Sequence, residues 1–197
     1  LDYYTWHYIF IFQIGFILLI LLWFQLRQAE TLSEANKKKF SATVFFDGIK
    51  EFFSIRQTVI YTIVSGLVGG AFFVYLSSAA QVFQNQYCLT DKFVYVFGGL
   101  AFSMGVASVL NSSLVIKFGM KKLATSFLIV FCLSSLCYIL LFFNQGNPRL
   151  VIVSLFFAIQ FLALGFIFGN VRSLAMQPIG HIAGVGAALN GFVSTLM

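Results

Sequence analysis

Polar and aromatic side chains inside otherwise apolar stretches are the residues through which this chain could hold another molecule. An amide in apolar surroundings hydrogen-bonds either a solute or a neighbouring helix. Aromatic ring faces attract cations and apolar molecules. By depth and chemistry, the candidates for a binding cavity are Tyr61, Phe72, Phe73, Tyr75, Met104, Asn111, Gln160, Asn170 and Asn190. The alternatives are that the amides only join helices, and that each aromatic ring only packs against lipid or a neighbour.

The residues needed for enzyme chemistry are missing from the sequence. There is no carboxylate pair, metal-ligand cluster, nucleophile with an adjacent base, or phosphate-binding loop. His7 and His181, the two histidines, fall near opposite ends of the predicted helices. We therefore expect no catalysis, no cofactor, no metal and no nucleic-acid partner.

The candidate residues must be positioned by long apolar elements. Of the 197 residues, 60% are hydrophobic and 9% charged, whereas soluble domains carry about 25% charged residues. A bilayer-spanning helix needs about 20 apolar residues. Because the runs are continuously apolar, a membrane β-barrel with its alternating pattern is disfavoured. We predict an all-α membrane protein with six transmembrane helices, one in each long run without Asp, Glu, Lys or Arg. The predicted spans are 3–26, about 58–80, 93–116, 123–143, a fifth that ends at Asn170 and a sixth from about 179, with outer loops at 81–92 and 144–148.

Basic residues indicate the orientation, because they accumulate in cytoplasmic loops. The loops on one side of the six predicted helices hold ten Lys and Arg residues, and those on the other side hold two, Lys92 and Arg149. Lys117, Lys121 and Lys122 lie on the basic side, around Gly119. We read them as cytoplasmic anchors of a helical hairpin in the plasma membrane. Arg172 and His181 are expected at the same side as interfacial anchors, with a role in a gate as the alternative.

The chain divides into a transmembrane helix at 1–26, a cytoplasmic loop at 27–57 and a bundle at 58–197. Within the loop, apolar residues at 44–55 recur with helical spacing, which favours an amphipathic helix on the membrane surface. The alternative is that they form the leading end of the next span. With both ends outside, this topology suggests a fragment with an odd number of spans before Leu1 and at least one after Met197. In the second span, Gly66 and Gly70 lie four residues apart, as in closely packed membrane helices.

Two stretches carry a family resemblance: residues 170–184, NVRSLAMQPIGHIAG, and residues 70–90, GAFFVYLSSAAQVFQNQYCLT. They resemble the Major Facilitator Superfamily, and within it the bicyclomycin and multidrug-resistance branch of drug:proton antiporters. The first looks like the junction of the family's tenth and eleventh helices, and the second like its seventh helix and the following outer loop. Lys117, Gly119, Lys121 and Lys122 match the second copy of the family's cytoplasmic loop motif. Ser112 and Ile116 depart from that motif, and Ala80 and Cys88 depart from the branch's usual proline and glycine.

The resemblance implies helices six to eleven of a twelve-helix transporter, in a bacterial inner membrane. It implies export of a small amphipathic drug or metabolite in exchange for protons, by alternating access. Since ionisable residues inside spans mark function and none falls in the predicted spans, the proton-binding carboxylate is expected in the N-terminal half. The alternatives are a facilitator that imports a nutrient or metabolite, and a membrane scaffold subunit that transports nothing.

Overall fold

A computed structural model describes residues 7–28, 42–90, 92–144 and 146–197 of the chain. All regular structure in these ranges is helical. The chain separates into two compact units, 1–41 and 42–197. The all-α prediction is therefore confirmed.

The first unit contains one described helix, α1, which spans His7–Arg27. Its side chains are apolar on all sides, and each one is exposed within the chain. A helix that is hydrophobic all round is either buried in a large protein or spans a membrane. The helix is long and apolar enough to cross a bilayer, as predicted for this region.

The second unit begins with α2, Ala42–Ser54, followed by α3, Arg56–Ala80. Ile55 separates them because its backbone is extended, with φ −91° and ψ 102°. The segment is therefore a helix of its own and not the leading end of the next span. Phe52 is buried, whereas Phe46 and Phe53 are exposed. This two-sided character fits the predicted amphipathic helix, whose position on a membrane surface stays a prediction.

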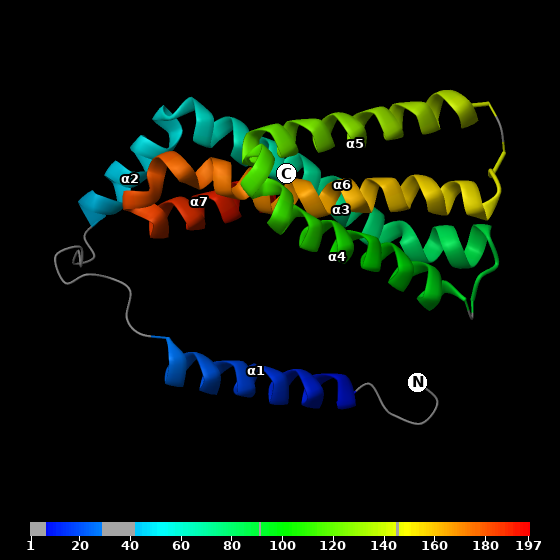
Figure 1. Cartoon of the computed structure of the whole chain (residues 1–197), viewed down its shortest axis with the longest axis horizontal. Coiled ribbons are helices and arrows are strands. Elements are labelled where there is room, and N and C mark those ends of the chain that lie inside the picture. Colours follow the sequence, from blue (N-terminus) through cyan, green and yellow to red (C-terminus); the bar gives the residue numbers. More distant parts are fainter. Residues whose placement is uncertain (1–6, 29–41, 91, 145) are drawn as a thin grey trace. The chain divides into compact units, whose positions relative to one another are not determined.

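Four long helices form the bundle in Figure 1: α3, α4 (Phe93–Phe118), α5 (Met120–Phe142) and α6 (Leu150–Met176). Helix α6 packs against each of the other three and contributes eleven buried residues, more than any other helix. Gly165 lies where α6 meets α4, beside Ala107. A side chain at this position would collide with α4, so glycine permits the close approach.

The final helix, α7, spans Ala183–Leu196 and packs against α3 and α2. Helix α6 continues past Asn170, where the predicted span ended, because asparagine, arginine and serine do not break a helix. Pro178 then falls in a short 3-10 segment, Gln177–Ile182 (η3), in which Ile179 is non-helical. Proline lacks the N–H that a continuing helix requires. The reversal of the chain at η3 is visible in Figure 1.

Five helical runs among the described residues are long and apolar enough to cross a membrane. The last of them, Leu150–Leu196, includes both α6 and α7, so it covers two of the six predicted spans. The outer loop predicted from Gln81 begins later, because α3 continues as a π-helical segment, Gln81–Gln86 (η2). No proline or glycine lies in these residues to end the helix.

Small residues also bring α3 close to α7. A Cβ atom added to Gly66 would lie 3.2 Å from the Ser194 Cα and 2.8 Å from the Met197 sulfur. The predicted role of Gly66 and Gly70 in close packing therefore fits this contact, since Gly70 also faces Met197.

The three cysteines are free and exposed.

Candidate functional site

The predicted amides form hydrogen bonds between helices. The Asn170 Nδ2 of α6 donates to the Asn111 Oδ1 of α4 at 2.7 Å and to the Phe166 carbonyl oxygen at 2.9 Å. The Gln160 Nε2 donates to the Ser135 Oγ of α5 at 3.0 Å. Helix α6 is thus tied to α4 and α5 by side-chain amides. Such bonds stabilise membrane helix pairs by about 0.6 to 2 kcal/mol each.

Asn190 makes the corresponding bond between α7 and α3. Its Nδ2 donates to the Thr62 Oγ1 at 2.9 Å, and both side chains are buried. These contacts fit the alternative interpretation of the amides as interhelical partners. Their use by a solute stays a prediction.

Two of the predicted aromatic residues meet in the bundle around Phe161 of α6. The ring centroid of Phe72 lies 5.7 Å from that of Phe161, and the Tyr75 centroid lies 4.8 Å from it. Met104 packs against the same cluster. Phe73 is 66% exposed, so its ring lies outside the cluster. Tyr61 packs near the other end of α3, against a second core cluster.

The Tyr75 hydroxyl is buried without a hydrogen-bond partner among the described residues. An unpaired buried hydroxyl destabilises a fold by about 1–3 kcal/mol. We therefore expect Tyr75→Phe to stabilise the isolated chain by about 1 kcal/mol, measured as a higher midpoint of thermal unfolding in detergent. Tyr95→Phe is the control, because Tyr95 is 80% exposed and its loss should leave the midpoint unchanged. A lower midpoint for Tyr75→Phe would mean that the hydroxyl has a partner.

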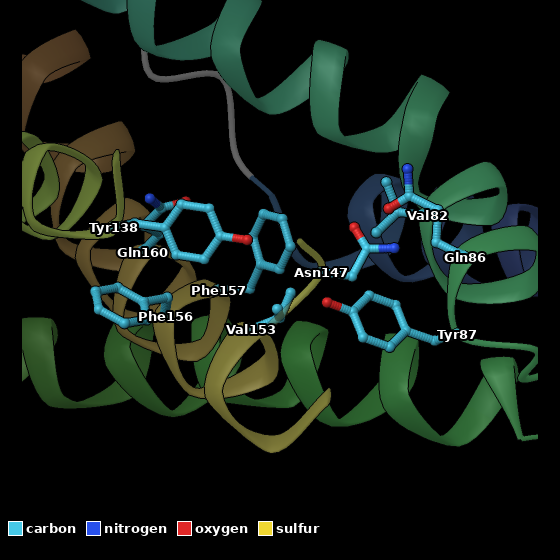
Figure 2. Close-up of a pocket in the computed structure, with 9 residues that line it drawn as sticks. All are labelled: Val82, Gln86, Tyr87, Tyr138, Asn147, Val153, Phe156, Phe157 and Gln160. Carbon is cyan, nitrogen blue, oxygen red and sulfur yellow. The ribbon is translucent and has the colours of Figure 1, made fainter. Parts of the chain in front are cut away.

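A separate cavity of about 180 Å³ lies where η2, α5 and α6 meet, shown in Figure 2. Its walls are apolar and aromatic, with amides and phenols between them. The lining residues are Val82, Gln86, Tyr87, Tyr138, Asn147, Val153, Phe156, Phe157 and Gln160. Of the nine residues predicted for a binding cavity, this one includes Gln160. The structure does not bring the nine together around one cavity within the described residues, so their shared role stays a prediction.

The lining of this cavity is uncharged at neutral pH. It contains no Asp, Glu, Lys or Arg among the described residues. Burial raises the pKa of Tyr87, and the neighbouring Tyr138 raises it further, so the Tyr87 phenol stays protonated. Its hydroxyl donates to the Pro148 carbonyl oxygen at 2.8 Å, which holds the turn between α5 and α6 against the end of α3. The cavity suits a small uncharged molecule with an apolar body.

Sequence reasoning missed most of this cavity because its residues come from helix ends and turns. Tyr87 and Asn147 fall in predicted loops, and they meet only once η2 and the α5–α6 turn are placed. One signal was present: three polar residues are followed by a tyrosine in QNQY, residues 84–87, directly after an apolar span.

The predicted loop motif forms the sharp turn between α4 and α5. Gly119 alone separates the helices, and its backbone has φ +80°. L-residues with a side chain rarely adopt this backbone conformation. The Lys117 Nζ lies 5.5 Å from the centroid of the Phe118 ring, and the Lys122 Nζ lies 5.6 Å from it on the same ring. Glycine is thus required by the turn, and the two lysines contact the phenylalanine.

Long apolar helices joined by interhelical amides are the features of an integral membrane protein. The Major Facilitator Superfamily model matches residues 1–197, and the chain belongs to this family. It is 26% identical over 203 residues to an uncharacterized MFS-type transporter, YdgK of Bacillus subtilis (strain 168). That alignment covers 100% of this chain and 49% of the relative, so the chain spans about half the relative's length. No solved structure matches this chain.

Proposed function

We propose that the protein to which this chain belongs exports small amphipathic drugs or metabolites in exchange for protons, by alternating access. Family membership supports transport. The observation that favours an amphipathic solute is the uncharged cavity of about 180 Å³ with aromatic walls and amide groups. The likeness of residues 70–90 and 170–184 to drug:proton antiporters supports the exchange with protons.

In this proposal the nine predicted residues contribute to the solute pathway of the whole protein, together with a second half. Their amides serve as helix contacts in the state described here and become solute contacts in another state. The proton is bound outside this chain, because the described spans carry Asp, Glu, Lys and Arg only near their ends. The protein resides in the plasma membrane, which is the bacterial inner membrane that the family resemblance implies.

The test is expression of the full-length gene in a host that lacks its own drug pumps. We expect at least a fourfold rise in the inhibitory concentration of some amphipathic compounds. An ionophore that collapses the proton gradient should abolish efflux. Protein present in the membrane with no change across a broad panel of compounds would contradict the proposal.

A cavity-filling variant examines whether this cavity lies on the solute pathway. Val153 lines it and is 3% exposed, whereas Val151 on the same helix is 76% exposed. Val153→Trp is expected to lower the resistance at least fourfold, because the indole occupies the cavity. Val151→Trp, its control, should keep the resistance of the parent. Equal resistance in both variants, at equal protein levels, would place the solute pathway elsewhere.

A further inference from the structure

Two adjoining hollows lie at the basic end of the bundle, where α3 and α5 begin and α6 ends. They have volumes of about 620 and 450 Å³ and share Lys121, Leu174 and Gln177 in their walls. Lys122 lines the first and Arg56 the second. The two hollows thus bring together three cationic side chains from two helices.

The walls carry hydrogen-bond donors and no acid among the described residues. Thr125 and Ser126 line the first hollow, and Gln57 lines the second. The Gln57 Nε2 donates to the Leu174 carbonyl oxygen at 3.0 Å, which fixes the start of α3 against the end of α6. With no carboxylate to neutralise the three cations within the walls, the hollows favour an anion.

The helix ends reinforce this preference. Helix α3 begins at Arg56 and α5 at Met120, and neither has a side-chain cap on its first N–H groups. The N-terminus of a helix carries partial positive charge and unpaired N–H groups. Both termini contribute residues to the hollows, so their fields add to those of Lys121, Lys122 and Arg56.

The walls of both hollows also contain apolar residues beside the cationic ones. Met120 and Leu174 lie in the first hollow, and Ile60 and Leu174 in the second. Ile60 is 44% exposed, on a helix that is long and apolar enough to span a membrane. An anion bound here would therefore contact cationic and hydroxyl groups, and it would also lie next to an apolar helix surface.

We propose that these hollows bind a phosphate group through Lys121, Arg56 and Lys122. Two sources carry this chemistry: the headgroup of an anionic phospholipid, and a phosphate ion in solution. Basic pockets between membrane helices bind lipid headgroups in this way. The apolar flank at Ile60 and Leu174 gives the lipid an additional contact that the free ion lacks.

The test measures lipid bound to the purified full chain by native mass spectrometry. Phosphatidylglycerol and phosphatidylcholine with identical acyl chains are compared at equal concentration. We expect phosphatidylglycerol to be retained preferentially, and Lys121→Gln to reduce its retention about fivefold, the factor for one basic side chain at an anionic lipid. Lys121→Arg should preserve retention, which shows that the effect is not a folding defect.

Lys117→Gln is the matched control. It removes the same charge from the same turn, but Lys117 lines neither hollow. We expect its retention of phosphatidylglycerol to equal that of the parent chain. Equal losses in Lys117→Gln and Lys121→Gln would indicate non-specific electrostatic attraction of the lipid to the basic end of the bundle. Equal retention of the two lipids would indicate no preference for the anionic headgroup. Either result would overturn the proposal.

A second arm identifies the source of the phosphate. Inorganic phosphate is added at millimolar concentration to the chain loaded with phosphatidylglycerol. Unchanged lipid retention assigns the site to the lipid headgroup. Displacement of the lipid, absent with chloride at equal ionic strength, assigns it to free phosphate. Both results support a phosphate site, whereas equal displacement by chloride would contradict one.

Discussion

Gly165→Val is expected to separate α6 from α4 and to lower the free energy of unfolding by about 3 kcal/mol, at the upper end of the range for an overpacked core. A Cβ atom at this position would lie 2.6 Å from the Ala107 Cβ and 2.6 Å from the Met104 carbonyl oxygen. The carbonyl belongs to the backbone of α4, which cannot rotate away as a side chain would. The measurement is thermal unfolding of the purified chain in detergent, followed by circular dichroism.

Gly169→Val supplies the control for this experiment. Gly169 lies one turn further along α6, and a Cβ atom there would meet nothing within 4 Å. Both variants introduce the same β-branched residue into the same helix, so they share its effect on helix propensity. Equal destabilisation by the two variants would show that the contact with α4 is not what requires glycine.

Phe161→Ala is the second change with a large expected effect, about 3 kcal/mol of lost stability. Phe161 is 4% exposed, and its ring meets those of Phe72 and Tyr75. Lipid does not favour helix association through hydrophobicity, so packing contacts carry more of the stability. Truncation removes these contacts and leaves a void between α3 and α6. The midpoint of thermal unfolding reports the loss.

Phe73→Ala removes the same ring from the exposed side of α3. Because Phe73 is 66% exposed, its truncation should change the midpoint by much less than that of Phe161. If Phe161→Ala leaves the midpoint unchanged, the cluster is not part of the packed core.

The helices were predictable from the charges, because lipid excludes them from long stretches of chain. The predicted helices at 93–116 and 123–143 correspond closely to α4 and α5. The helix ends were less predictable. Helix α6 continues to Met176 and α3 continues through η2 to Gln86, since polar residues at a membrane surface do not end a helix. Pro178 and Gly119, which alter the backbone itself, marked their boundaries well.

The inward faces of the helices could not be predicted from the sequence. Phe72 and Phe73 are adjacent and chemically identical, yet one packs on Phe161 and the other is exposed. In water, polarity distinguishes the core face from the surface, but in lipid both faces are apolar. The pairing of Asn111 with Asn170 likewise depends on how α4 and α6 are rotated. A single sequence does not encode that rotation in its polarity pattern.

The turn at Gly119 has a mechanical implication for how the bundle can rearrange. Since one residue links Phe118 to Met120, their Cα atoms cannot separate by more than about 7.6 Å, two peptide lengths. The adjoining ends of α4 and α5 must therefore travel together in any rearrangement of the bundle. By contrast, α7 follows a 3-10 segment of six residues, so its first residue is not held to this limit relative to the end of α6.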